Sequence, residues 1–219
     1  KISSLQPLDS IAVIGTRHPT EFAAKSAFRI ASRLAKEQFI IISGLALGCD
    51  TKAHQGCIDS KGRTVSILAH GLDKVYPKSN TALAEQILDY GGALVSEYHL
   101  GEEPRPAYFV ERDRIQSGLS RAVFVIETDV DGGTMQTVRF AMKQGRELVV
   151  LSHPDRFAND PKSAGNRELL AINQIRPIRD LDDLKAMIDN LRNPIERSSA
   201  DHKGSHLTGA QTNLLGNER

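Results

Sequence analysis

The chain alternates short apolar runs with longer amphipathic segments, and this alternation limits its possible folds more than any other feature. Most of the runs are apolar at consecutive positions, which is typical of parallel strands that helices cover on both faces. The alternation predicts right-handed βαβ units, and so an α/β fold: a Rossmann-like, doubly wound, mainly parallel sheet flanked by helices. The predicted strands are residues 11–15, 39–43, 64–69, 93–97, 122–127 and 147–152.

The last third of the chain is less regular. Residues 164–174 and 181–191 are predicted helices, separated by an extended segment at 175–178. From Asn193 onward the chain is polar and lacks apolar periodicity, which is typical of a flexible tail or linker. We expect three parts: a Rossmann-like domain over 1–178, a C-terminal helix over 179–192 and a tail over 193–219.

The charge balance narrows the class of protein. Lys and Arg number 28 and Asp and Glu 27, a formal net charge of +1, and 40% of the residues are hydrophobic. These values exclude a disordered chain and a highly basic chromatin-type packer, so any nucleic-acid site must be a local patch. Two cysteines cannot build a disulfide framework, and no apolar run approaches the roughly 20 residues of a membrane span. We therefore expect a cytoplasmic protein without a membrane partner.

The loops that follow the first two predicted strands contain candidate phosphate-binding residues, since ligands bind at the carboxyl ends of parallel strands. Arg17 follows the first strand, and either forms an anion site with the next helix or is simply a solvated turn residue. After the second strand, the small residues Ser43, Gly44 and Gly48 allow a phosphate to approach the backbone.

Asp50 and His54 begin the helix that follows this second loop. They are four residues apart and share one helical face, so they can form a hydrogen bond. The pair either positions a ligand or has a purely structural role.

Two later segments contain further candidate phosphate-binding residues. Lys78 lies in a loop with Tyr76, a pairing suited to single-stranded nucleic acid, although an ordinary loop is equally compatible. Arg112 and Arg114 alternate with Glu111 and Asp113, so one arginine can reach a phosphate while the other pairs with a carboxylate.

The fifth predicted strand ends at Glu127, which we expect to have a positioning role. The residues Gly132, Gly133 and Thr134 then open a helix and form a second potential anion site, or an ordinary glycine turn with a threonine cap. The convergence of several such loops at one sheet edge favours phosphate binding.

No motif in the chain requires catalysis. The glycine-rich loops match neither a Walker loop nor the dinucleotide-binding fingerprint, and no Cys and His spacing resembles a metal site. No Ser elbow supports a triad of Ser43, His54 and Asp50. We expect no catalytic residue, no cofactor and no metal.

The loop segments, taken together and in order, resemble the DprA/Smf DNA-processing family. The resemblance extends from about Ile11 to about Ile175. It implies an extended Rossmann fold that binds single-stranded DNA in a basic pocket. It also implies a homodimer that passes DNA to a RecA-type recombinase during natural transformation, and a binding protein rather than an enzyme. The segments are GTR (15–17), SGLALGCDTKAH (43–54), GLDKVYPKSN (71–80), SEY (96–98), ERDRIQSGLS (111–120), GGTMQT (132–137) and GR (145–146).

By resemblance, the DNA pocket would be lined by Arg17, the loop 43–50, Lys78, Arg112 and Arg114. This chain departs from the family at several of these positions. The usual Arg-Asn-Arg is Arg112-Asp113-Arg114, Leu47 stands where Arg is frequent, and Gly132-Gly133-Thr134 replaces a Ser-Gly-Ser type of turn. The negative charges of Glu111 and Asp113 should weaken phosphate binding.

Two alternative functions follow from these departures. The first is a DprA-like regulator or antitoxin of a defence operon, with a toxin as its partner. The second is a nucleotide phosphoribohydrolase similar to LOG proteins, because Gly132-Gly133-Thr134 resembles part of their PGGxGT loop.

Overall fold

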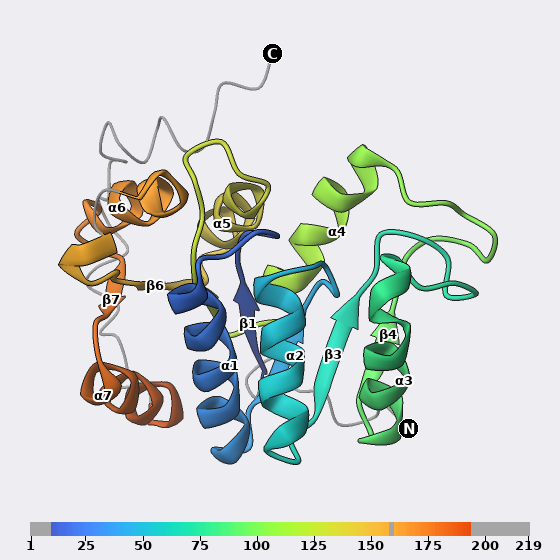
Figure 1. The fold of residues 1–219 in the computed structure, drawn as a ribbon, viewed down its shortest axis with the longest axis horizontal. Helices are drawn as coiled ribbons and strands as arrows, with labels where there is room; N and C mark the ends of the chain where they lie inside the picture. Colours follow the sequence, from blue (N-terminus) through green and yellow to red (C-terminus); the bar gives the residue numbers. More distant parts are fainter. Residues whose placement is uncertain (1–9, 158–159, 194–219) are drawn as a thin grey trace.

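The structure, a computed structural model, describes residues 10–157 and 160–193, so the predicted tail from residue 194 lies outside the described residues. These residues form a seven-stranded sheet in the order β4-β3-β2-β1-β5-β6-β7 (Figure 1). Every neighbouring pair is parallel, so the doubly wound α/β prediction is confirmed. The strands are β1 (Ser10–Ile14), β2 (Ile40–Ser43), β3 (Thr64–Ile67), β4 (Ala93–Val95), β5 (Ala122–Val125), β6 (Glu147–Leu151) and β7 (Arg176–Ile178).

All six predicted strands are present, and the extended segment at 175–178 is β7. The helices are α1 (Glu21–Lys36), α2 (Cys49–Asp59), α3 (Thr81–Asp89), α4 (Pro106–Gly118), α5 (Thr134–Lys143), α6 (Ala164–Leu170) and α7 (Leu181–Arg192). Short 3-10 turns are η2 (Lys78–Asn80), η3 (Asp155–Phe157) and η4 (Pro161–Ser163). Among the described residues, no helix is long and apolar enough to cross a membrane.

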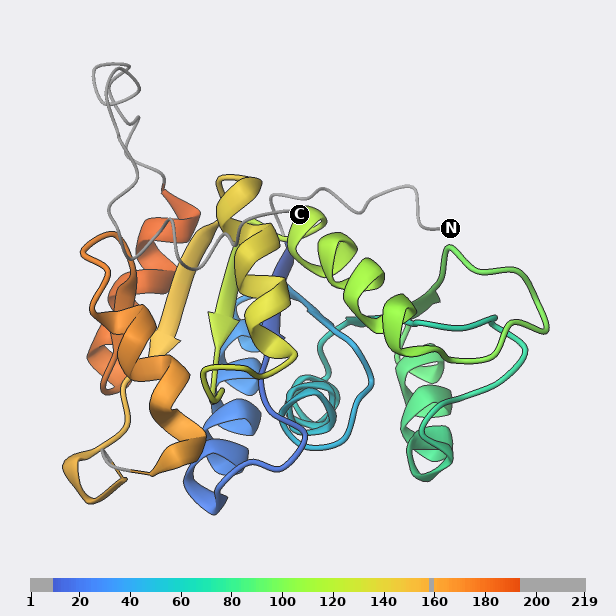
Figure 2. The same cartoon turned by 90° about the horizontal axis from the view of Figure 1, so that it is seen from above.

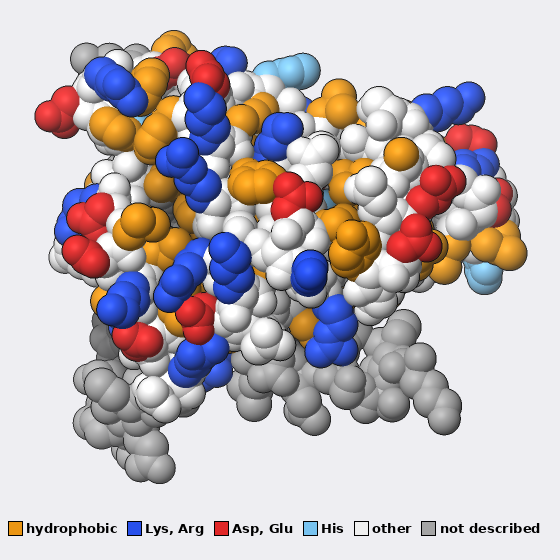
Figure 3. Space-filling view, turned by 60° about the horizontal axis from the view of Figure 1, so that its bottom comes forward, with side chains coloured by type: hydrophobic (Ala, Val, Ile, Leu, Met, Phe, Trp, Pro, Cys, Tyr) orange, Lys and Arg blue, Asp and Glu red, His pale blue; other side chains and the backbone are white. Residues whose placement is uncertain are grey.

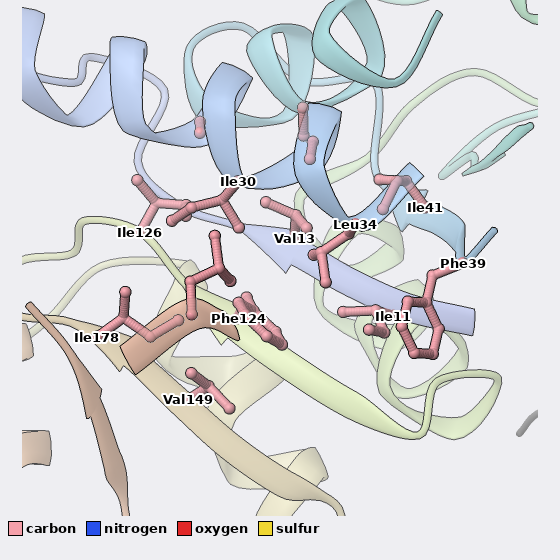
Figure 4. Close-up of a cluster of buried hydrophobic side chains, with 14 of the residues drawn as sticks. Ile11, Val13, Ile30, Leu34, Phe39, Ile41, Phe124, Ile126, Val149 and Ile178 are labelled. Carbon is pink, nitrogen blue, oxygen red and sulfur yellow. The ribbon is translucent and has the colours of Figure 1, made fainter. Parts of the chain in front are cut away.

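Consecutive strand residues pack into different cores because their side chains alternate between the two faces of the sheet. Ile11 and Val13 of β1 pack against α1, α2 and α7, whereas Ala12 and Ile14 pack against α5. Figure 4 shows the first of these cores, in which Phe124 lies near Val13 and Leu34. Each buried Ile, Val, Leu or Phe side chain in these cores contributes about 1.5–3 kcal/mol. Both faces are therefore covered, which explains the apolar runs.

The topological switch point of the sheet lies between β1 and β5. From β1 the chain proceeds through β2 and β3 to the β4 edge, and α4 then returns it to β5 on the other side of β1. The helices α1 and α2 lie on one side of these strands and α4 and α5 on the other (Figure 2). The loops after β1 and β5 therefore diverge, which leaves a crevice at the carboxyl ends of the two strands.

Candidate functional site

A cavity of about 730 Å³ occupies the crevice at the switch point, and we call it the switch-point cavity. Its walls come from the loops after β1, β2, β3 and β5, from the segment before α4 and α4 itself, and from the first turns of α2 and α5. The lining residues are Ile14, Gly15, Thr16, Arg17, His18, Ala46, Asp50, Tyr76, Pro104, Pro106, Phe109, Val110, Arg112, Asp113, Gln116, Thr128, Asp129, Gly132, Gly133, Thr134 and Thr137.

Arg17 and two aromatic rings form one wall of this cavity. The exposed Arg17 guanidinium lies 5.0 Å from the centroid of the Phe109 ring, within the range of a cation–π contact. The Tyr76 ring is 5.9 Å from that of Phe109. Within residues 10–157 and 160–193, Arg17 forms no ion pair, so its charge is available to an anionic ligand. A cation beside aromatic faces suits a phosphate next to a base.

The β5–α5 loop forms the opposite wall. Thr134 begins α5, and the first turn closes with the Met135 amide donating to the Gly132 carbonyl at 2.9 Å. A Cβ on Gly133 would meet no atom within 4 Å, so this position faces open space. The first amides of a helix lack intrahelical acceptors and carry partial positive charge. The structure thus places the predicted Gly132, Gly133 and Thr134 around the same cavity as Arg17.

Arg112 lines the cavity, but most of its hydrogen-bonding capacity is used inside the protein. It is 5% exposed, and its Nη1 donates to the carbonyl of Gly44 at 2.9 Å and to that of Ile67. Its Nε donates to Asp113 Oδ1 at 2.8 Å. The prediction that one arginine pairs with a neighbouring carboxylate is confirmed for Arg112. Arg112 therefore joins α4 to the carboxyl ends of β2 and β3.

Gly44 is a glycine because Arg112 packs against it. A Cβ at this position would lie 2.4 Å from two guanidinium nitrogens of Arg112. Gly44 is absent from the cavity wall, since Arg112 occupies the space beside it, and its contact with a phosphate stays a prediction.

Two largely buried carboxyl groups, those of Asp50 and Asp113, place negative charge in the cavity wall. Burial raises the pKa of Asp113 to about 6, although Arg112 opposes this increase. Burial also raises the pKa of Asp50, against the opposing effects of Arg112, Ser43 and the Ala46 and Gly44 amides. The Asp50 carboxylate accepts from the Gly44 amide at 3.1 Å and the Ala46 amide at 3.3 Å. Asp50 thus holds the β2–α2 loop in place.

The expected hydrogen bond between Asp50 and His54 is not formed. His54 Nδ1 instead lies 2.7 Å from Thr64 Oγ1, and burial, reinforced by Arg112, lowers the pKa of His54 to about 3. His54 is fully buried and lies outside the cavity wall. The α2 face that Asp50 and His54 share packs into the protein, and each group finds a nearer partner there.

Ser43 and Gly48 also have structural positions away from the cavity wall. The Ser43 hydroxyl is buried and donates to the Val13 carbonyl at 2.7 Å. Gly48 has φ +78°, and a Cβ there would lie 2.4 Å from the Thr16 carbonyl oxygen. These residues join the β2–α2 loop to β1 and the Arg17 loop, so their predicted direct contact with a phosphate is not supported by their positions.

Lys78 and Arg114 lie on the surface and are absent from the cavity wall. Lys78 is exposed in η2. Arg114 is paired with Glu97 and not with Glu111 or Asp113 as expected, because it projects from the opposite side of α4 to Arg112. Glu111 accepts a hydrogen bond from the Tyr98 hydroxyl at 3.0 Å. The structure therefore separates Arg112 from Arg114.

Glu127 holds the start of α1 at the switch point. Its buried carboxylate accepts from the Thr20 amide and the Thr20 hydroxyl, both at 2.7 Å, and lies 3.0 Å from His153 Nε2. Burial acts to raise the pKa of Glu127, but the hydrogen bonds from His153 and Thr20 outweigh it and lower the pKa. Thr20 also caps α1 by accepting from the Ala23 amide at 3.2 Å.

Phe109 is not among the predicted site residues, and the sequence pattern does not predict the helix α4. The buried face of α4 is polar and consists of Arg112, Asp113, Gln116 and Ser117. An apolar periodicity is therefore missing, and helix prediction from hydrophobic spacing fails. The available signal is the aromatic residue three positions before Arg112, which places both on one helical face.

The fold and this cavity define a class: Rossmann-like proteins with an open crevice at the sheet switch point. A family model described as DNA recombination-mediator protein A matches residues 1–189, and the chain belongs to that family. The earlier resemblance to DprA/Smf proteins is thereby confirmed.

The curated relatives that the chain matches are longer than the matched segment. Protein Smf of Synechocystis sp. is 39% identical over 149 residues, which are 68% of this chain and 37% of the relative. DNA processing protein DprA of Streptococcus pneumoniae is 37% identical over 144 residues, 64% of this chain and 49% of the relative. The chain thus spans less than half the length of these relatives.

Solved structures agree with this assignment. DNA processing protein A from Helicobacter pylori, solved to explain its single-stranded DNA binding mode, superposes with a TM-score of 0.75 at 30% identity. The superposition covers 86% of this chain and 83% of the other. The DprA structure from Streptococcus pneumoniae has a TM-score of 0.71 at 33% identity, covering 82% and 62%.

Proposed function

We propose that this chain is a DNA-processing protein that binds single-stranded DNA in the switch-point cavity. The observation that carries the proposal is the placement of the exposed Arg17, the Phe109 ring and the start of α5 around one cavity. Arg17 and the α5 amides can bind phosphates while Phe109 stacks on a base, and this combination requires no particular base sequence. The H. pylori relative, whose structure concerns single-stranded DNA binding, supports the same ligand.

The cavity favours a single strand over a duplex. A base can reach Phe109 only when it is unstacked from a partner strand, whereas a duplex presents phosphates alone. The largely buried Asp50 and Asp113 are part of the cavity wall, and their negative charge opposes a high density of phosphates inside the cavity. We therefore expect the phosphates of the bound strand to lie at the rim of the switch-point cavity, next to Arg17 and the start of α5. We expect one base to lie inside the cavity.

A titration with fluorescent oligo-dT, with a duplex of the same length as control, tests this proposal. We expect salt-sensitive binding that is tighter for the single strand. Equal affinity for the duplex, or no binding at low salt, would contradict it.

We further propose that the chain acts as a homodimer in the cytoplasm and delivers its strand to a RecA-type recombinase during DNA uptake. These assignments rest on membership of the family and on the resemblance described above. Light scattering of the purified protein tests the dimer, and a recombinase-loading assay on coated single strands tests the delivery. A toxin-directed regulatory role is the alternative if DNA binds but no recombinase is loaded.

A nucleotide phosphoribohydrolase is the second candidate, and Asp113 is the observation that favours it. This carboxyl lines the cavity together with the Gly132–Thr134 turn, and burial raises its pKa to about 6, near that of a general acid. This candidate predicts release of a free base from a nucleoside monophosphate. Our primary proposal predicts no release with any nucleotide.

A further inference from the structure

A second cavity, of about 330 Å³, lies between α1 and α2 and shares no lining residue with the switch-point cavity. We call it the α1–α2 groove, and its lining is Glu21, Ala24, Lys25, Phe28, Arg29 and Lys52. The two helices touch at Gly56, where a Cβ would lie 2.1 Å from the Phe28 carbonyl oxygen. Because Lys52 lies one turn before Gly56, the groove lies on the N-terminal side of this contact along α2.

The groove begins close to the Arg17 loop. The N-terminus of α2 contacts that loop, since the Cys49 amide donates to the Thr16 carbonyl at 3.1 Å. A Cβ on Gly48 would lie 2.6 Å from the Arg17 carbonyl oxygen, so no space separates the loop from the start of α2. A ligand that leaves the switch-point cavity at Arg17 therefore reaches the α1–α2 groove over the first turn of α2.

The lining of the groove is basic. Lys25, Arg29 and Lys52 oppose the single carboxylate of Glu21. Glu21 pairs with Lys25, but both side chains are largely exposed, and such pairs contribute little. Lys52 Nζ donates to Gln55 at 3.0 Å, and Arg29 forms no ion pair within the described part of the chain. Arg29 and Lys52 thus offer two positive charges to a polyanion.

The positive charge continues along the exposed face of α1. Arg33 and Lys36 follow Arg29 at four and seven positions, so they lie on the same side of the helix. Arg33 is paired with Glu37 at 2.8 Å. In the space-filling view, Lys and Arg side chains gather over the part of the molecule formed by α1 (Figure 3).

The presence of Phe28 in the groove favours a nucleic acid over an acidic protein as the ligand. Its half-buried ring lies in the groove among the three cations. An acidic protein surface needs only the charges, whereas a single strand also presents base faces that stack on an aromatic ring. A ring flanked by cations is the combination found in sequence-tolerant single-strand sites.

We propose that the α1–α2 groove is a second contact site for the same single strand. The strand leaves the switch-point cavity at Arg17, crosses the first turn of α2 and enters the groove. Arg29 and Lys52 bind its phosphates, and Phe28 stacks on one of its bases. This inference rests on the proposed function, because it extends the path of the strand beyond the switch-point cavity.

The test measures affinity for a length series of oligo-dT at several salt concentrations. The variants are Arg29→Ala, Lys52→Ala and Phe28→Leu, with Lys185→Ala on α7 as the matched charge-removal control. For the longest strands, we expect Arg29→Ala and Lys52→Ala each to reduce the salt slope by about 0.7. Phe28→Leu retains apolar packing and should weaken binding about fivefold or more. For the shortest strands that still bind, the affinities of these variants should equal those of the wild type and of Lys185→Ala.

The outcomes separate failure of this inference from failure of the proposed function. If wild type binds and Arg17→Ala weakens every length, but the groove variants match wild type at every length, the inference is wrong. An acidic protein surface then becomes the alternative occupant of the groove. If wild type binds no single strand, or Arg17→Ala has no effect at any length, the proposed function fails as well. Melting temperatures of the variants confirm that each is folded.

Discussion

The guanidinium of Arg112 donates from Nη1 to the carbonyl of Gly44 at 2.9 Å, and this contact determines how α4 sits on the sheet. The two residues are 68 positions apart in the chain. The same side chain donates to Ile67 and Asp113, so one buried residue connects the ends of two strands to a helix. The family resemblance assigns Arg112 to the DNA pocket, whereas its contacts in this chain are those of an anchor.

Replacing Arg112 should destabilise the fold. Arg112→Ala leaves Asp113 buried without its partner, and the expected loss is about 3–5 kcal/mol in the free energy of unfolding. Urea denaturation measures this loss. Arg114→Ala is the control, since its exposed pair with Glu97 should contribute at most about 1 kcal/mol. Unchanged stability of Arg112→Ala with loss of DNA affinity would show that Arg112 is a ligand contact instead.

Gly44→Ala should be destabilising for a steric reason. The added Cβ would lie 2.4 Å from the Arg112 guanidinium, and that group could move away only by breaking its hydrogen bonds to Gly44, Ile67 and Asp113. Forced overpacking of this kind costs about 1–3 kcal/mol. Gly133→Ala provides the comparison, because its φ of −53° suits alanine and its Cβ would meet no atom. If both variants unfold at the same urea concentration as wild type, the packing of Arg112 on Gly44 is contradicted.

Asp113 should make stability depend on pH. Burial raises its folded-state pKa to about 6 from the ordinary 3.8, although Arg112 opposes the shift. The folded protein then binds this proton more tightly than the unfolded chain, so stability falls as the pH rises from about 4 through 6. Asp113→Asn removes this loss. Its stability relative to wild type should increase by on the order of 3 kcal/mol from about pH 4 to about pH 7.

The relevant quantity is the difference between the two proteins at each pH, because the other titrating groups then cancel. A constant difference between Asp113→Asn and wild type across this range would contradict the raised pKa. The variant also restores the Arg-Asn-Arg pattern of the family and should bind DNA more tightly at neutral pH, since a negative charge near the phosphates is removed.

Phe109 should contribute to DNA affinity through stacking. Its ring lies 5.0 Å from the Arg17 guanidinium and 5.9 Å from the Tyr76 ring. Phe109→Ala should cost about 1–3 kcal/mol in binding free energy, as for other base-stacking aromatics. Because stacking carries no charge, the salt slope should stay the same. A reduced slope would indicate that the substitution displaces Arg17 and does not act through stacking alone.

The strands could be predicted from the sequence, whereas the residues that line the switch-point cavity could be predicted only in part. Runs such as 147–152 are apolar on both faces, and a covered parallel sheet is the main architecture that explains this pattern. The chain topology then brings Arg17 and Gly132–Thr134 to one edge, as expected. The rotation of α4 about its axis determines whether Arg112 or Arg114 faces the protein interior. The polar buried face of α4 gives no periodicity from which to predict that rotation.

In the β2–α2 loop, Gly44 and Gly48 lie away from the cavity wall, and this position has a physical cause. Small residues permit close approach, but sequence alone does not show what approaches. In this chain the occupants are protein groups: Arg112 packs on Gly44, and the Thr16 carbonyl approaches Gly48.

The salt dependence of single-strand binding by wild type and Arg17→Gln tests the central claim most directly. Arg17 is exposed, so its replacement should leave the free energy of unfolding within about 0.5 kcal/mol of wild type. The slope of the logarithm of the affinity for oligo-dT against that of the salt concentration should decrease by about 0.7, the value for one phosphate contact on a single strand. An unchanged affinity and slope in Arg17→Gln would contradict the assignment of the switch-point cavity to DNA.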